Sequence, residues 1–160
     1  MIGYRFNATG VFGYTYYTAG NRVCSVSSIV DPSAPVMIHG NGVAWTSNFD
    51  FFRTIFPGTT RNINDESTGT PLFRIVFGNT GQYKINDSIT VYCDEEKYTF
   101  YCDDKVIAKI LRFNGESGDL QKPSDTDYNY EPYFEVTVYN GIETELLMLI
   151  LAFPMLKFGL

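Results

Sequence analysis

Four oxygen-bearing side chains alternate along one acidic stretch of the chain: Asp125, Asp127, Asn129 and Glu131. This spacing resembles the start of a calcium-binding loop, in which alternate residues supply oxygen ligands. The glycine at the sixth position of such a loop is replaced by Tyr130, and no glutamate follows at the twelfth. The four residues are a calcium candidate with these two departures, and a solvated acidic loop is the favoured alternative. We predict no other metal site and no cofactor.

Residues that could carry out hydrolysis are scarce. A nucleophile needs an adjacent base, and the sequence holds one imidazole, His39, in a turn-like HGNG string. No G-x-S-x-G elbow is present, and the GESG string at residues 115–118 lacks its spacing. Acids that could form a catalytic pair occur at Asp103–Asp104 and at residues 94–96, but turns between strands explain both groups more simply. We therefore predict no catalytic residue and expect that the chain is not an enzyme.

Charge and cysteine content limit the partners and the compartment. The formal net charge of −6 disfavours nucleic acid as a partner and requires any basic binding surface to be local. Cys24, Cys93 and Cys102 form no CxxC pair, and three thiols leave one unpaired in any disulfide scheme. The N-terminal MIGYRFNATG lacks the basic and apolar regions of a signal peptide. We expect a cytoplasmic protein whose cysteines are core thiols.

Short runs suited to β-strands cover most of the chain. The 13 Phe and 12 Tyr favour pleated, half-buried surfaces. Gly, Asn, Asp and Pro separate the runs about every eight to twelve residues, as in a sandwich or barrel. No helical period is sustained before Gly141, which excludes a parallel βαβ design. Strands are expected near residues 2–6, 11–18, 22–28, 35–39, 43–47, 50–56, 60–64, 71–77, 83–86, 88–93, 98–102, 106–113 and 132–139.

Alternation predicts the register of two hairpins. A loop over residues 94–97 pairs Cys93 with Tyr98, Val91 with Phe100 and Ile89 with Cys102 on one apolar face. Closing the next hairpin with residues 103–105 places three further residues on that face: Val106, Ala108 and Ile110. A second hairpin, closed over residues 78–82, pairs Phe77 with Tyr83 and Ile75 with Ile85. A slip of one residue would move each set into water, so the register is strongly specified.

The last twenty residues contain a segment that we expect to form an apolar helix. The segment from Leu146 to Phe153 has no polar face, so apolar groups must surround it. It is shorter than the roughly 20 apolar residues of a membrane span, so the chain is not expected to be transmembrane. The helix is expected at about residues 141–157, capped by Asn140 and kinked or ended by Pro154. Its core positions are Leu146, Leu147, Leu149, Ile150 and Phe153.

The strings LFRIVF, QYKIN, SITVYC and YTFYCDDKVIAKILRF, followed by the apolar helix, resemble the tubby C-terminal superfamily. This group includes the LURP-one-related proteins, the phospholipid scramblases and many small bacterial proteins. The resemblance spans roughly Arg61 to Leu160, with its best local match from Val106 to Arg112, whereas residues 1–48 match only as a β-rich pattern. It implies a closed antiparallel barrel of about twelve strands around a central hydrophobic C-terminal helix, here a single domain of residues 1–160.

The resemblance implies binding and no catalytic residues. Tubby domains bind phosphoinositide headgroups through clustered Lys and Arg, and the small bacterial members are intracellular proteins without an assigned activity. The favoured function is a non-enzymatic domain that binds or scaffolds a protein partner. The alternative is a module for phosphoinositide or other anionic lipid headgroups, which predicts that Lys and Arg converge on one barrel face. In the sequence the basic residues are scattered singly: Arg53, Arg61, Arg74, Lys84, Lys97, Lys109 and Arg112.

Overall fold

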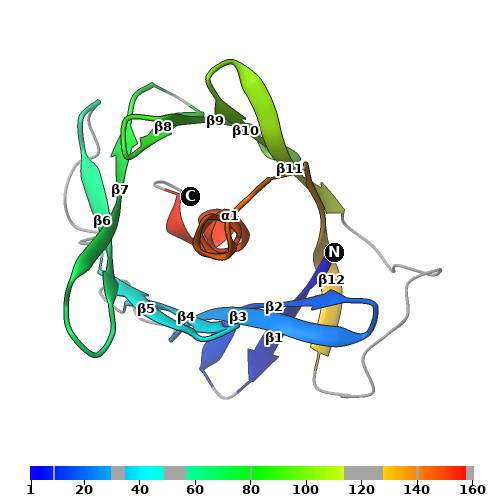
Figure 1. Ribbon diagram of the computed structural model, residues 1–160. Helices are drawn as coiled ribbons and strands as arrows, with labels where there is room; N and C mark the ends of the chain where they lie inside the picture. Colours follow the sequence, from blue (N-terminus) through cyan, green and yellow to red (C-terminus); the bar gives the residue numbers. More distant parts are fainter. Residues whose placement is uncertain are drawn as a thin grey trace.

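The computed structural model is a closed barrel of antiparallel strands wound around one helix (Figure 1). It describes residues 1–8, 10–29, 35–48, 57–79, 81–113, 128–139 and 141–157. Consecutive strands pair with one another, and β1 pairs with β12 to close the ring, which confirms the predicted fold class. The elements are β1 (Ile2–Ala8), β2 (Val11–Thr18), β3 (Asn21–Ile29), β4 (Val36–Gly40), β5 (Val43–Ser47), β6 (Thr60–Asp65), β7 (Pro71–Phe77), β8 (Gln82–Ile85), β9 (Ile89–Cys93), β10 (Lys97–Cys102), β11 (Lys105–Phe113), β12 (Tyr128–Val138) and α1 (Thr144–Leu156).

Twelve of the strands expected from the sequence correspond to these elements. The expected strand at residues 50–56 lies outside the described residues. The strand expected at residues 132–139 begins earlier than predicted, because Tyr128–Val138 form β12. Aromatic residues and β-pairing with β1 extend this strand beyond its predicted start, since Tyr128 pairs with Phe6.

The predicted hairpin registers are confirmed at two places. Cys93 pairs with Tyr98 and Val91 with Phe100, as alternation requires. In the neighbouring hairpin, Ile75 pairs with Ile85 and Phe77 with Tyr83. Val91, Phe100, Ile75 and Ile85 are almost fully buried, so inward-facing apolar residues determine the register.

The turn between β10 and β11 differs from the prediction. Cys102 pairs with Lys105, which leaves only Asp103 and Asp104 in the turn, both with positive φ, as a two-residue type I′ turn requires. Val106 therefore lies opposite Tyr101 and is absent from the buried core, contrary to expectation. The register shifts after this pair, so Ala108 and Ile110 still face inward.

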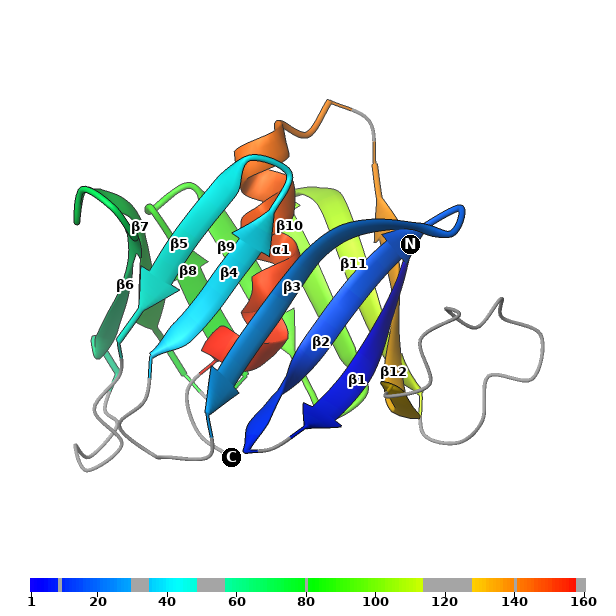
Figure 2. The same cartoon turned by 90° about the horizontal axis from the view of Figure 1, so that it is seen from below.

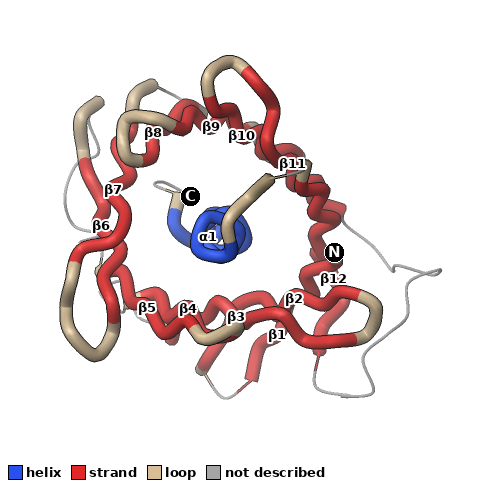
Figure 3. Tube along the Cα trace, in the orientation of Figure 1, coloured by secondary structure: helices blue, strands red, loops and turns tan. Residues whose placement is uncertain are grey.

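The helix fills the space inside the barrel (Figure 3). Its residues from Met148 to Phe153 are all buried, so the segment has no exposed face. Of the expected core positions, Leu149, Ile150 and Phe153 are buried, whereas Leu146 and Leu147 are partly buried. The Phe153 ring makes edge contacts with three aromatic rings of the wall at centroid distances of 5.3, 6.0 and 5.5 Å: Tyr83, Tyr98 and Phe100. None of the helices in the described part of the chain has the length and apolar content that a bilayer crossing requires.

The ends of α1 differ from the sequence prediction. The helix begins at Thr144, and its N-cap residue is Glu143, whose side chain makes no capping hydrogen bond. The expected cap, Asn140, lies outside the described residues. At the other end the helix continues through Pro154 to Leu156. Pro154 has no backbone N–H, so the hydrogen bond to the carbonyl of Ile150 is missing in this part of the helix.

Arg61 of β6 joins the C-terminal end of the helix to the barrel wall. Its guanidinium donates hydrogen bonds to Ser47 Oγ at 2.8 Å, to the Ser47 carbonyl at 3.3 Å and to the Leu156 carbonyl at 3.2 Å. The residue is 4% exposed, and burial lowers the pKa of Arg61 to about 10. The last turn of a helix has carbonyl groups without intrahelical partners, so Arg61 satisfies one of them.

Tyr16 carries a buried hydroxyl for which the described residues offer no hydrogen-bond partner. Leaving such a group unpaired costs about 1 to 3 kcal/mol. We expect Tyr16→Phe to raise the free energy of unfolding by about 1 kcal/mol, because the ring keeps its packing and the unpaired group is removed. Denaturant unfolding of the two proteins measures this difference. A loss of stability in the variant would contradict it and would show that a buried water molecule bonds to the hydroxyl.

Candidate functional site

Three basic side chains come together at one end of the barrel. We call this end, where α1 and β1 both terminate in Figure 2, the basic mouth, and define it by Arg5, Arg112 and Lys157. Each residue comes from a different element or its end: β1, β11 and the C-cap of α1. The fold thus brings basic residues that are far apart in the sequence to the same end of the barrel.

Strand alternation directs Arg5 and Arg112 toward the inside. Arg112 pairs with Phe134, which is 2% exposed and belongs to the core, and it follows the inward-facing Ile110 by two residues. Arg5 pairs with Tyr14, which packs against the same core. Both arginines therefore occupy inward-facing positions of their strands, at the rim where the apolar core ends.

Lys157 reaches the same place from the helix. Its Nζ lies 5.3 Å from the centroid of the Tyr98 ring, which is a cation–π distance. The Tyr98 ring is 6.3 Å from that of Phe134, and Phe134 is 4.5 Å from Tyr14. The three rings thus form a continuous series, and Lys157 lies over the ring at its Tyr98 end.

The pKa values of Tyr14 and Tyr98 respond to the charges of the basic mouth. Burial raises the pKa of Tyr14, and the positive charges of Arg5 and Arg112 oppose that rise. Burial also raises the pKa of Tyr98, where Arg112 again opposes the rise and Asp94 adds to it. Because charge effects of this kind require proximity, Arg112 lies near both hydroxyls. Both phenols are neutral at pH 7 and can donate hydrogen bonds to an anion.

No carboxylate within the described residues pairs with a cation of the basic mouth. Asp94 is the acid near Tyr98, but its Oδ1 accepts hydrogen bonds from the Glu96 and Lys97 amides at 2.8 Å. The ion pair between described residues joins His39 Nε2 to Glu66 Oε2 at 2.8 Å. Both side chains are exposed, and neither belongs to the basic mouth. Among the described residues, the three positive charges of the basic mouth thus have no ion-pair partner.

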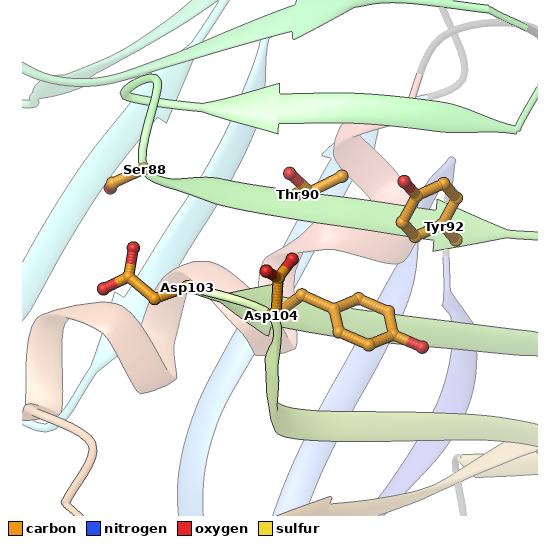
Figure 4. Close-up of a pocket in the computed structure, with 6 residues that line it drawn as sticks. Ser88, Thr90, Tyr92, Asp103 and Asp104 are labelled. Carbon is orange, nitrogen blue, oxygen red and sulfur yellow. The ribbon is translucent and has the colours of Figure 1, made fainter.

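A pocket lies on the outer wall of the barrel, along β9 and β10. It has a volume of about 440 Å³, and we call it the outer pocket. Figure 4 shows the carboxyl groups of Asp103 and Asp104 on the side of their turn that faces the β9 side chains. The lining residues are Ser88, Thr90, Tyr92, Tyr101, Asp103 and Asp104.

Among the described residues, the groups singled out for hydrolysis are not brought together. His39 Nε2 contacts Glu66 Oε2, while the hydroxyl of Ser25, which pairs with His39 across the sheet, is bonded to Thr15 and Arg22 instead. Burial raises the pKa of Cys24 to about 12, so its thiol is protonated in the core. The described residues contain no group of three potential metal ligands. Of the calcium candidate, Asp125 and Asp127 lie outside the described residues, and the side chains of Asn129 and Glu131 in β12 are not described either.

Two members of the basic mouth, Arg5 and Lys157, were absent from the basic residues considered in the sequence. Arg112 was considered, but only as one of several isolated cations. Side chains alternate along a strand, so the inward-facing Ala108 and Ile110 predict that Arg112, two residues further on, also faces the interior. No pattern in the sequence relates Arg5 or Lys157 to it, because their proximity depends on barrel closure and on the helix position.

The chain matches no protein-family model and has no significant match among curated proteins or solved structures.

Proposed function

We propose that the chain is a non-enzymatic binding domain that takes an anionic lipid headgroup at the basic mouth. The observation that carries this proposal is the convergence of Arg5, Arg112 and Lys157 without a carboxylate partner among the described residues. The sequence alone favoured a protein partner. We favour the lipid alternative over it, because converging Lys and Arg support that alternative.

The chemistry of the three side chains suits a phosphate group. Arginine presents a planar fork that can bind two phosphate oxygens at once, and lysine adds a compact point charge. The neutral hydroxyls of Tyr14 and Tyr98 are further donors beside them. Each Lys or Arg near an anionic membrane surface contributes about 1 kcal/mol to binding. Three such charges thus provide about 3 kcal/mol, which corresponds to roughly a hundredfold in affinity.

The resemblance to the tubby superfamily supports the same proposal. Members of that group bind phosphoinositide headgroups through clustered basic residues, which is the arrangement proposed here. The inner leaflet of the cell membrane is negatively charged, so the proposal places the protein at the cytoplasmic face. The net charge of −6 is compatible with this, because charges beyond a Debye length of about 8 Å are screened at physiological salt.

Vesicle flotation tests the proposal. We expect the wild-type protein to float with vesicles of phosphatidylcholine that contain a phosphoinositide, to float less with phosphatidylserine, and to remain unbound with phosphatidylcholine alone. Binding should weaken as salt increases, because the interaction is electrostatic. The triple variant Arg5→Glu, Arg112→Glu, Lys157→Glu should lose at least a hundredfold in affinity, since it removes and reverses the three charges.

A second triple variant serves as a matched control. Arg74→Glu, Lys84→Glu and Lys105→Glu produce the same change in net charge at exposed positions outside the basic mouth. This variant should retain most of its binding, and thermal unfolding of both variants checks that they are folded. Equal losses in the two variants would show that net charge governs binding and would contradict the proposed site. Failure of the wild-type protein to bind any of the vesicles would contradict the function itself.

A further inference from the structure

We propose that the outer pocket binds a lysine or arginine side chain of a protein partner. This inference rests on side chains that the basic mouth does not use, and it concerns the opposite end of the barrel wall. The pocket combines an aromatic surface with oxygen acceptors, which is the combination that holds an ammonium or guanidinium group.

The aromatic part of the pocket is formed by two tyrosines. The rings of Tyr92 and Tyr101 contact each other edge to face, at a centroid distance of 5.6 Å and an interplanar angle of 84°. Tyr92 is 50% exposed, so much of its surface is open to solvent. This contact fixes the orientation of an exposed ring, which lowers the entropy that a ligand would have to remove. A cation can therefore lie against a ring that is already positioned.

The polar part of the pocket consists of acceptors. The hydroxyls of Ser88 and Thr90 lie along β9, and the carboxylates of Asp103 and Asp104 face them from the turn (Figure 4). Neither carboxylate forms an ion pair with a described residue. A charged guanidinium has five N–H donors and no acceptor, so it matches a wall of oxygens.

The basic residues near the pocket do not occupy it. Lys84 pairs with Thr90 across the neighbouring strand, and Lys105 follows the turn directly. Both side chains are exposed, and neither forms an ion pair with a described carboxylate. None of the described basic residues lines the pocket.

The two carboxylates of the pocket lie away from the basic mouth. The amide of Arg112 donates to the Glu96 carbonyl, which puts the start of β10 beside the basic mouth. Asp103 and Asp104 follow the other end of this six-residue strand. At about 3.4 Å per residue, the strand separates these two carboxylates from the basic mouth by roughly 17 to 20 Å. Tyr92 lies nearer to the basic mouth, because it pairs with Thr99, the neighbour of Tyr98.

An NMR titration tests this inference with two short peptides, acetyl-Gly-Arg-Gly-amide and acetyl-Gly-Lys-Gly-amide. We expect saturable shifts of the backbone amides of Ser88, Thr90 and Tyr92 at millimolar peptide, and no shifts with acetyl-Gly-Gln-Gly-amide. The variant Asp103→Asn, Asp104→Asn should bind at least tenfold more weakly. Its fold should be unchanged, because asparagine suits the positive φ of a type I′ turn. Tyr92→Leu should weaken binding about threefold through the loss of the cation–π contact.

The control variant Asp94→Asn, Glu95→Gln makes the same change in charge at the neighbouring β9–β10 turn. It should bind both peptides within about twofold of the wild-type protein, in line with its exposed position. The inference is overturned if the basic peptides cause no localised shifts at the outer pocket. It is also overturned if the two double variants lose affinity equally, which would show a general attraction of cations to an acidic protein.

Discussion

Leu149→Arg is expected to abolish cooperative folding. Leu149 has no exposed surface and lies on the helix inside the barrel. Replacing a buried leucine costs about 2 to 5 kcal/mol through lost packing, and burying an unpaired charge adds several kcal/mol. Together these losses are comparable to the whole stability of a domain, which is about 5 to 15 kcal/mol. Circular dichroism and thermal unfolding should show no cooperative transition.

The same substitution on the outer wall is the matched control. Leu111 of β11 is 37% exposed, so its arginine variant keeps the new charge in water. We expect Leu111→Arg to change the free energy of unfolding by less than about 0.5 kcal/mol. Leu149→Ala should fall between the two, with a loss of about 3 kcal/mol. A Leu149→Arg protein that melts like the wild type would mean that the helix does not occupy the barrel interior.

Arg61→Ala is expected to produce the second largest loss, about 3 kcal/mol. The substitution removes a charged donor from Ser47 and Leu156, and each hydrogen bond to a charged group contributes about 1.5 to 3 kcal/mol. It also leaves space inside the barrel where the buried side chain packed. Denaturant unfolding measures the loss.

The neighbouring strand supplies a control for Arg61. Arg74 of β7 is exposed, and we expect Arg74→Ala to change stability by less than about 0.5 kcal/mol. Hydrogen exchange separates the local effect from the global one. In Arg61→Ala the amides at the end of α1 should exchange faster than those of the wall, because the end of the helix is released first. Equal stability of Arg61→Ala and the wild type would show that Arg61 does not hold the helix.

The barrel could be predicted because apolar and polar residues alternate along its strands, whereas the helix is apolar on all sides. Val91, Phe100 and Ile75 each face a buried partner, and a slip of one residue would expose all of them, so pattern alone determined the pairing. The length of the turn at Asp103 was harder to predict, because two- and three-residue turns differ only in whether Lys105 belongs to the turn or pairs with Cys102. The start of α1 was misplaced because Glu143 caps the helix without a side-chain bond, which leaves no sequence signal.

The candidate site could be predicted only in part. Asp103 and Asp104 were recognised as a turn, but the tyrosines beside them were not connected with it, because Tyr92 belongs to a different strand. The basic mouth depends on long-range closure. Arg5 meets Arg112 only once β1 pairs with β12, and Lys157 meets Tyr98 only once the helix enters the barrel. These contacts span most of the chain, and local spacing carries no information about them.

The most direct test of the central claim is an NMR titration of the full chain with a soluble short-chain phosphoinositide. We predict that the largest shifts occur at Arg5, Tyr14, Tyr98, Arg112 and Lys157, with the amides of the outer pocket unchanged. These shifts should saturate and should be absent in the Arg5→Glu, Arg112→Glu, Lys157→Glu variant. Shifts centred on any other face of the barrel, or no shifts at saturating ligand, would contradict the assignment of the basic mouth as the binding site.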